Sequence, residues 1–556
     1  MGDNLIETMK NLYLKQYIES GYEPLYSSCT KEELFVEMSD GVKLHTTIYK
    51  PDTAIEKLPV ILTRTCYPIL EPICQLHGEE LSKRGYIYIY QYCRGTGPSE
   101  GQWVPNINER QDGIETVDWV LKQPWTDVLG VWGTSYLALT GWAMADAVNG
   151  KVTSMCLNHY GTDRFTSAYE KGMFRQDVLT SWSMQNTGFK VTSDYDETCK
   201  YMPQEEVDVN LWGAEVPWYR EYVTNTRKED SYWQQGFWKQ LSEIPTKVQM
   251  PIYIVSGWYD HHLGSTLKSW SMLNPVSKKH SWFDIGAWNH SFINCIADKE
   301  TVNSDSGEVY RMLNWFDITL KQRELPESRI RTYQINEDKW YEMKSWESKS
   351  VNPKKLWLNT KDKAIESEVV KEEADCQYIY DPKNPVTTYG SESCLQNMSF
   401  NGSLMQKEAN YRPDVISFVS APLEKDLEIM GKIELELFVK SDCEDTAFTA
   451  KVMQVNQAGV AYNIRSSIAT IEQGSIDGEN YVPNTVVKVV IEMWDVCYTI
   501  KKGEKLRLDI SSSDYPNYHI HSNYRGVWGK QTKQKLANQT LLSGERYPSA
   551  ITIQAK

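Results

Sequence analysis

Apolar and polar residues follow patterns that predict an α/β unit at the start of the chain. Short apolar runs are separated by stretches with the spacing of amphipathic helices, and strands alternating with helices in this way predict right-handed βαβ units and a mostly parallel sheet. The runs that predict buried strands are 58–67, 86–93, 128–132, 155–161, 250–260 and 280–290. A helix over 4–19 precedes them, and a helix over 307–322 ends the pattern.

Two further patterns divide the chain. Residues 161–246 are rich in Trp, Tyr and Gln, show helical stretches and lack strong strands, which predicts a helical cap inserted above the sheet. Residues 1–160 and 247–328 then form the two parts of the α/β unit. From 329 to 556, short strands separated by turn residues predict an all-β sandwich of the jelly-roll type.

Composition and charge limit the partners of this chain. With 556 residues, 41% of them apolar and 24% charged, the chain is long enough for several globular units. The net charge of −15 offers no basic stripe to meet phosphates, so no nucleic acid partner is expected. No apolar run approaches the length of a membrane span, and the first residues do not show a basic segment followed by an apolar one, so neither a membrane contact nor a signal peptide is expected.

The eleven cysteines are scattered and form no C-x-x-C pair, which is typical of reduced thiols. We therefore expect a cytoplasmic protein that holds no metal and needs no cofactor. The number of subunits is not predicted, and a homodimer is left open.

One turn between a strand and a helix carries a candidate nucleophile. Ser135 follows the apolar run that ends at Trp132, and a helix-like run starts at Tyr136. A serine hydroxyl needs a base and an oxyanion hole to act as a nucleophile, and α/β-hydrolases place such a serine on a sharp strand–turn–helix elbow of the form G-x-S-x-G. Gly133 fits this form, whereas Leu137 stands where the second glycine is expected. A serine that merely caps the helix is the alternative for this residue taken alone.

Two later strands end in the other members of a catalytic triad. Asp260 ends the strand over 250–260, and His290 ends the strand over 280–290. Open α/β sheets present their catalytic loops at the carboxyl ends of the strands, and the order Ser, Asp, His is that of the α/β-hydrolases. We therefore expect Ser135 to attack an acyl carbonyl, His290 to transfer the proton, and Asp260 to fix the tautomer of the histidine.

Three other histidines are rivals for the role of base. His261 and His262 adjoin Asp260, where a triad within one turn would be awkward. His280 starts its strand and should lie at the opposite edge of the sheet. Asp260 itself has an alternative role as the cap of the following helix.

The motifs together resemble the cocaine esterase and X-prolyl dipeptidyl-peptidase family (CocE/NonD hydrolases). The elbow "GTSYLA" is similar to the family's elbow, in which the glycine comes one place later, and Ala138 stands at that place here. The resemblance continues through "SDGVKLHTTIYKP", "RGTGPSEG", "SGWYD", "GAWNHS" and "RLDISSSDYPNY" and covers nearly the whole chain. One motif departs from the family: Tyr92 stands where Asp usually precedes Arg-Gly, so Arg94 must pair with a different group.

The resemblance implies an α/β-hydrolase domain, a helical cap and a jelly-roll domain. It also implies an oxyanion hole formed by the hydroxyl of Tyr67, in "RTCYP", and the backbone N–H of Tyr136. Aromatic residues of the cap are expected to wall the substrate pocket. Those singled out are Trp182, Trp212, Trp218 and Trp233.

The residues directly after the triad aspartate bear on the substrate class. Relatives that cleave α-amino acid esters resemble one another in a carboxylate cluster at this point, and here His261 and His262 come after Asp260 instead. The acidic residues of the cap, Asp163, Glu170 and Asp177, are expected on solvated faces and not as an ammonium anchor. We therefore expect a serine hydrolase of carboxylic esters, with amides open, and an X-prolyl dipeptidyl-peptidase as the alternative. The expected partner is a small-molecule ester or a short peptide substrate. A catalytically silent ligand-binding protein is the alternative from another class.

Overall fold

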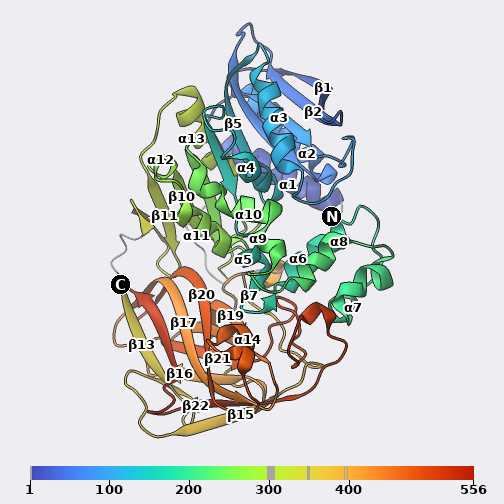
Figure 1. Ribbon diagram of the computed structural model, residues 1–556. Helices are drawn as coiled ribbons and strands as arrows, with labels where there is room; N and C mark the ends of the chain where they lie inside the picture. Colours follow the sequence, from blue (N-terminus) through green and yellow to red (C-terminus); the bar gives the residue numbers. More distant parts are fainter. Residues whose placement is uncertain (1–2, 297–306, 347–350, 393–394, 397) are drawn as a thin grey trace.

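The computed structural model describes residues 3–296, 307–346, 351–392, 395–396 and 398–556. Figure 1 shows two sheet-containing units with a group of helices beside the junction between them. The first unit holds a ten-stranded sheet in the order β1-β2-β4-β3-β5-β6-β9-β10-β11-β12. From β4 to β11 all neighbouring strands are parallel. The predicted α/β fold class, with a separate all-β unit after it, is confirmed.

Most strands in the middle of the sheet are short and buried along their whole length, as their continuous apolar runs predict, whereas the two strands at its edges are largely exposed. The strands of this sheet are β1 (Cys29–Glu37), β2 (Lys43–Pro51), β3 (Leu58–Thr65), β4 (Ile87–Tyr92), β5 (Thr126–Thr134), β6 (Ser154–Asn158), β9 (Ile252–Tyr259), β10 (Trp282–Asn289), β11 (Arg329–Gln334) and β12 (Lys339–Met343). The helices around the sheet are α1 (Asp3–Glu19), α2 (Glu71–Lys83), α3 (Glu109–Leu121), α4 (Tyr136–Met144), α11 (Leu263–Met272), α12 (Pro275–Lys278) and α13 (Glu308–Phe316).

The last two strands of this sheet differ from the expectation. The pattern over 329–343 predicted the start of the β-sandwich, but β11 pairs in parallel with β10, and β12 pairs with β11. Both therefore extend the first sheet. A strand's own sequence does not show which sheet it joins. The sheet edge with which it can pair depends on where the preceding helix ends in the folded protein.

The cap is mainly helical and contains a two-stranded hairpin. Its helices are α5 (Arg164–Ala168), α6 (Gln176–Gln185), α7 (Tyr195–Lys200), α8 (Pro217–Thr224), α9 (Ser231–Gln234) and α10 (Gly236–Glu243). The hairpin consists of β7 (Tyr169–Glu170) and β8 (Met173–Phe174). No helix of the described residues combines the length and the apolar character needed to cross a membrane.

In its described residues, the C-terminal unit is built from β-strands with one short α-helix, α14 (Ile471–Gly474). The long strand over 427–441 alternates buried and partly exposed positions, as in a sheet with one face on a core, whereas the strands over 447–455 and 505–511 are almost entirely buried. The strands of this unit are β13 (Asn352–Asn359), β14 (Ala364–Glu366), β15 (Ala374–Tyr380), β16 (Ile416–Ser420), β17 (Leu427–Ser441), β18 (Ala447–Val455), β19 (Ala461–Thr470), β20 (Val487–Ile500), β21 (Lys505–Ser511), β22 (Ala537–Ser543) and β23 (Ala550–Ala555).

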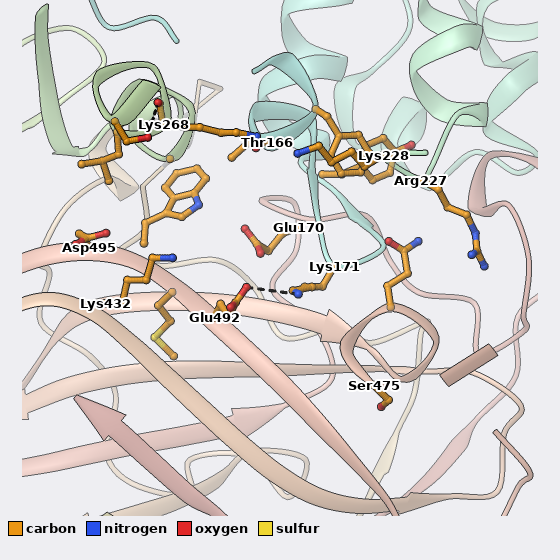
Figure 2. Close-up of a pocket in the computed structure, with 18 of the residues that line it drawn as sticks. Thr166, Glu170, Lys171, Arg227, Lys228, Lys268, Lys432, Ser475, Glu492 and Asp495 are labelled. Atoms are coloured by element: carbon orange, nitrogen blue, oxygen red, sulfur yellow. Dashed lines mark hydrogen bonds and ion pairs between the residues drawn. The ribbon is translucent and has the colours of Figure 1, made fainter. Parts of the chain in front are cut away.

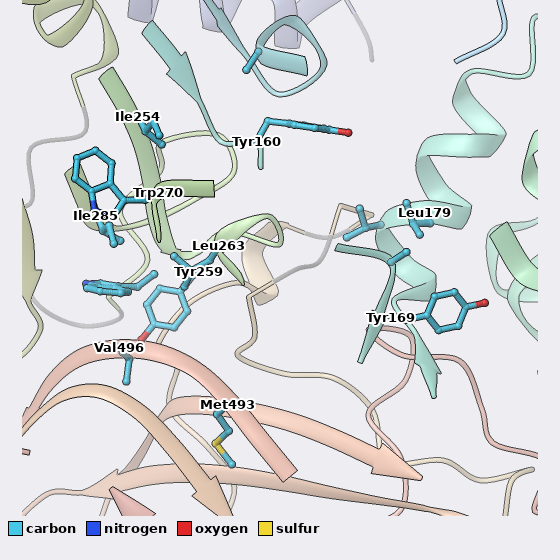
Figure 3. Close-up of a cluster of buried hydrophobic side chains, with 14 of the residues drawn as sticks. Tyr160, Tyr169, Leu179, Ile254, Tyr259, Leu263, Trp270, Ile285, Met493 and Val496 are labelled. Atoms are coloured by element: carbon cyan, nitrogen blue, oxygen red, sulfur yellow. The ribbon is translucent and has the colours of Figure 1, made fainter. Parts of the chain in front are cut away.

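The hydrophobic core continues from one unit into the next. Figure 3 shows Ile254 and Ile285 of the central sheet, Tyr259 at the end of β9, and Met493 and Val496 of β20 in one region. All five side chains are at most 1% exposed. The C-terminal unit therefore packs directly beneath the carboxyl end of β9, where the candidate triad begins.

Candidate active site

The turn at Ser135 has the strained geometry of a nucleophile elbow. Ser135 has φ 60° and ψ −127°, between the end of β5 and the first residue of α4. A positive φ at a residue with a side chain costs free energy, and such strain clusters at functional sites. The surrounding structure holds it, since the Ser135 N–H donates to the Asn158 carbonyl at 2.9 Å.

The elbow needs its first glycine but not the second. A Cβ at Gly133 would collide with the Leu137 carbonyl group and lie 2.6 Å from the backbone N of Ala138. Leu137 itself lines a cavity, so its side chain has room. The mismatch with G-x-S-x-G therefore falls at a position that the turn does not require to be glycine.

Three side chains from three strand ends meet at this turn. Ser135 Oγ lies 2.8 Å from Nε2 of His290, and Nδ1 of His290 lies 2.9 Å from Oδ1 of Asp260. Parallel strands bring their carboxyl ends to one edge of the sheet, which is why residues 155 positions apart can share a hydrogen bond. The predicted triad is thus one connected chain of hydrogen bonds.

The charge on Asp260 is explained by its surroundings. Burial alone would raise the pKa of this fully buried carboxyl, but the adjacent His159 and His290 rings hold its pKa well below the usual range. An ionised carboxylate can only accept hydrogen bonds, so Nδ1 of each histidine must carry the proton. Nε2 of His290 is then free to accept the hydroxyl proton of Ser135, which is the tautomer that a general base needs.

His159 is a second histidine on the same carboxylate. It follows β6, has φ 51°, is fully buried, and places Nδ1 2.9 Å from Oδ2 of Asp260. Sequence reasoning missed it, although it ends a strand of the sheet just as Asp260 and His290 do. A polar residue directly after a buried parallel strand is a pattern that could have identified His159.

The three rival histidines take other places. His261 packs against His290 with ring centroids 4.1 Å apart, and His262 places Nδ1 2.9 Å from Ser167 Oγ. Burial lowers the pKa of His261 and of His262 well below the usual value, so both stay neutral. His280 lies just before β10, with Nδ1 2.9 Å from the Pro326 carbonyl, at the opposite edge of the sheet.

One group of potential metal ligands exists among the described residues. The ligand atoms of His159, Asp260 and His290 lie within 4.8 Å of one another. Both contacts to Asp260 have hydrogen-bond length, and the serine on His290 extends the chain. A hydrogen-bonded relay therefore accounts for the group.

Tyr67 is the residue whose hydroxyl the resemblance implies as an oxyanion donor. Its ring lines the same cavity as Ser135, and its hydroxyl accepts a 2.8 Å hydrogen bond from Nε1 of Trp182. Accepting this bond leaves the hydroxyl proton to be donated. Burial raises the pKa of Tyr67 well above its ordinary value, so the phenol remains a donor at any physiological pH.

Tyr136 is the first residue of α4, so its N–H has no acceptor within the helix. Its ring stacks on Trp182 at 6.1 Å, and its hydroxyl donates to Glu109 at 2.9 Å. Trp182 thus contacts both residues expected to form the oxyanion hole.

None of the four cap tryptophans lines the cavity that contains Ser135, contrary to the expectation that they wall the pocket. Trp182 contacts Tyr67, and Trp218 packs on Trp182 with ring centroids 5.7 Å apart. Trp212 packs on Tyr219, and Trp233 packs among aromatic rings of the cap, so both are buried in the cap core away from Ser135. Aromatic composition does not separate a cavity wall from a core position.

The expectation for the acidic residues of the cap was wrong. Asp163 is 6% exposed and Asp177 is fully buried, and Glu170 has a side chain that is 12% exposed. Each has partners far along the chain or in a neighbouring element, and these cannot be read from local sequence. Asp163 pairs with Lys228 and Lys268, Asp177 accepts from Tyr195 and Leu395, and Glu170 accepts from Arg175.

Arg94 has the different partner that its motif required. Its guanidinium donates to both oxygens of Asp112, at 2.7 and 3.1 Å, and to Asp40 at 2.6 Å. Asp112 comes from α3, so the loop that holds Arg94 is tied to a helix and not to its own strand.

Two cavities lie near the site. The cavity that contains Ser135, His290 and Tyr67 measures about 180 Å³. A larger cleft of about 1100 Å³ lies between the cap, α11 and the C-terminal unit, and the triad does not line it. Figure 2 shows its mixed charges, with Lys171 and Glu492 facing each other at 3.4 Å across the junction. Ser135 and His290 both line the smaller cavity, which is therefore the candidate reaction site.

Comparisons with known proteins show which families this chain resembles. The family model for X-Pro dipeptidyl-peptidase (S15 family) matches residues 40–292, and that for the X-Pro dipeptidyl-peptidase C-terminal non-catalytic domain matches residues 324–552. Cocaine esterase from Rhodococcus sp. (strain MB1 Bresler) is 24% identical over an alignment of 569 positions. The alignment covers 94% of this chain and 97% of that protein.

Solved structures show the same fold. An aminopeptidase from a marine sediment archaeon, Thaumarchaeota archaeon, has a TM-score of 0.82 at 21% identity and covers 95% of this chain and 96% of its own. An α-amino acid ester hydrolase has a TM-score of 0.81 at 19% identity, covering 95% and 97%.

The fold and the site define an α/β-hydrolase with a C-terminal β-domain. Within that class, the chain belongs to the cocaine esterase and X-Pro dipeptidyl-peptidase family, the CocE/NonD serine hydrolases.

Proposed function

We propose that this protein is a serine hydrolase that cleaves carboxylic esters through an acyl-enzyme. The observation that carries the proposal is the hydrogen-bonded chain from Ser135 through His290 to Asp260, built on a strained elbow. Ser135 Oγ attacks the acyl carbon while His290 Nε2 takes its proton, and His290 then protonates the leaving alcohol. Water attacks the acyl-enzyme in the second half of the reaction, with His290 again as the base.

Charge that develops on the carbonyl oxygen needs donors that are already in place. The hydroxyl of Tyr67 and the N–H of Tyr136 are proposed for this role. Support comes from the raised pKa of Tyr67, which keeps its proton, and from the contact of Trp182 with both residues.

An X-prolyl dipeptidyl-peptidase is the second candidate. It is favoured by the names of the two matching family models and by the aminopeptidase among the structural neighbours. Both candidates use the same triad and differ in whether the site holds a free substrate amine.

A fluorophosphonate probe tests the triad directly. Labelling followed by peptide mass spectrometry should place the adduct on Ser135, and Ser135→Ala should abolish it. Ser271→Ala, which changes an exposed serine in α11, serves as the matched control and should label normally. Absence of label, or label on another residue, would overturn the proposal. Rates on p-nitrophenyl esters and on Gly-Pro-p-nitroanilide then decide between esterase and dipeptidyl-peptidase.

A further inference from the structure

The N-terminal helix α1 reaches the cavity of the triad. Met9 and Tyr13, four residues apart and therefore on one face of the helix, line the same cavity as Ser135 and His290. Helix α1 precedes the first strand, and its residues lie outside the 40–292 match. It therefore adds a wall to the site beyond the strand-end loops that carry the triad.

Hydrogen bonds hold α1 against the sheet. Tyr13 donates to Oε2 of Glu308 at 2.9 Å, and the Tyr17 hydroxyl lies 2.9 Å from Nδ1 of His77. Arg84 donates to the Tyr17 carbonyl at 3.0 Å, and Tyr17 is fully buried. The wall is thus a packed element with side chains in fixed places.

The same contacts lead to the nucleophile elbow. Glu308, at the start of α13, accepts from Tyr13 on one oxygen and from Thr134 and Asn158 on the other. Thr134 directly precedes Ser135, and the Asn158 carbonyl accepts a hydrogen bond from the Ser135 N–H. Glu308 therefore connects α1 to both strand ends that hold the serine.

The chemistry of the cavity favours an uncharged, apolar group. Apart from Glu308, the described lining contains no Lys, Arg, Asp or Glu side chain. The carboxylate of Glu308 already accepts from three donors, and burial lowers the pKa of His77 to about 3, so that ring is neutral. Apolar walls come from Met9, Leu70, Ile73, Trp132 and Phe292.

The size of the cavity sets an upper limit on that group. An apolar cavity of about 150 Å³ is enough to bind benzene. About 180 Å³ therefore holds a phenyl ring or a short branched alkyl chain. The acyl group remains bonded to Ser135 after the alcohol has left and until water attacks. A cavity with fixed walls beside the serine is therefore better placed to bind the acyl group than the alcohol.

We propose that this cavity is the acyl pocket, that α1 forms its wall with Met9 limiting its depth, and that the substrates are esters of short neutral aliphatic or aryl carboxylic acids. The inference rests on the proposed serine-hydrolase function and adds the substrate class. It assigns Met9 and Tyr13 a role in specificity and none in the chemical step.

Two substitutions at Met9 in the full chain test the wall. Each methylene that gains a place in an apolar pocket is worth about four-fold in kcat/KM. Met9→Ala should shift the optimum of a p-nitrophenyl acyl series, from acetate to decanoate, toward longer chains, with about a fifteen-fold gain on an ester two methylenes beyond the wild-type optimum. Met9→Trp should cut kcat/KM on esters of wild-type optimum length about ten-fold and leave p-nitrophenyl acetate within two-fold.

Leu12→Ala is the matched control, because Leu12 lies on the same helix and is 50% exposed. Its acyl profile should match the wild type. A parallel series of acetate esters with lengthening alcohols should not respond to the Met9 changes. A fluorophosphonate titration of Ser135 in each variant counts the folded, competent sites, so a misfolded variant is recognised and rates are given per titrated site.

The outcomes separate the two proposals. If the wild type neither labels nor cleaves any ester, the proposed function fails. If the wild type is active but its acyl profile is unchanged in both Met9 variants, or if the alcohol series shifts instead, the acyl-pocket inference fails. Preference for α-aminoacyl esters over their neutral counterparts would also overturn it.

Discussion

Nδ1 of His159 lies 2.9 Å from Oδ2 of Asp260, so the carboxylate of the triad is held between two histidines. His159 donates on one oxygen and His290 on the other. The carboxylate also accepts from Ser256 Oγ and from the His262 N–H. Of these donors only His159 brings a second imidazole to it, and this donor draws part of the negative charge away from His290. We therefore predict that His159 tunes the proposed base as well as orienting it.

Removing that donor should change both rate and pH dependence. In His159→Leu, more of the charge of Asp260 acts on His290 and stabilises its protonated form, so the acid limb of the kcat/KM profile should move to higher pH. The loss of a hydrogen bond to a charged group, about 1.5 to 3 kcal/mol, should lower kcat roughly ten- to hundred-fold. His159→Asn keeps a donor near the Nδ1 position and tolerates the positive φ, and should retain most of the activity and the wild-type profile. An acid limb that stays in place in His159→Leu would refute this role.

Tyr67→Phe should lower kcat by about 10²- to 10³-fold with little change in KM, because an oxyanion donor acts mainly in the transition state. Trp182→Phe removes the hydrogen bond that orients the Tyr67 hydroxyl and keeps the aromatic packing. A neutral hydrogen bond is worth about 1 kcal/mol, so kcat should fall about five-fold. Steady-state kinetics on a p-nitrophenyl ester measure both. Full activity in Tyr67→Phe would leave Tyr67 as a packing residue.

The geometry of the elbow predicts that substitution of Gly133 is more damaging than substitution of Ala138. Gly133→Ala places a Cβ against the backbone of Leu137 and Ala138, and should destabilise the α/β unit by about 1 to 3 kcal/mol or more and reduce labelling by a fluorophosphonate. Ala138→Gly introduces no contact and costs only the helix propensity of about 1 kcal/mol. Thermal unfolding and active-site titration compare the two. Equal effects would contradict the assignment of Gly133 as the residue that closes the turn.

The free energy of unfolding should decrease as pH rises because of the buried Glu170 side chain. Burial raises the pKa of Glu170 to about 7 despite the nearby Arg175, whereas its ordinary value is 4.5. Between these values the folded state keeps a proton that the unfolded state has lost, so the free energy of unfolding decreases with pH across this window. Glu170→Gln should remove this slope and leave stability at pH 4 nearly unchanged, as seen in thermal midpoints from pH 4 to 8. A slope that persists in the variant would show that another group causes it.

Local sequence patterns could predict much of this protein. Continuous apolar runs marked the buried parallel strands, because a strand covered on both faces needs no polar positions. A residue that ends such a strand lies at the carboxyl edge of the sheet, and this rule alone placed Ser135, Asp260 and His290 at one edge. The same rule also covers His159, which directly follows β6.

Residues whose neighbours are remote in the chain could not be placed in this way. The sequence does not show that Trp182 reaches Tyr67 while Trp212 lies in the cap core, because both are large aromatic residues in helical segments. Nor does it show that Asp163 and Asp177 are buried, since their burial depends on partners that folding brings together.

The sequence by itself determined the alternation of strands and helices, the order of the triad and the unusual elbow, because these depend on residues close together or on strand ends. Only the tertiary structure decided which sheet β11 and β12 join, which carboxylate Arg94 binds, and that α1 walls the cavity of Ser135. Those features depend on the packing of distant segments, where apolar area and hydrogen-bond partners are shared among elements and no single segment carries the signal.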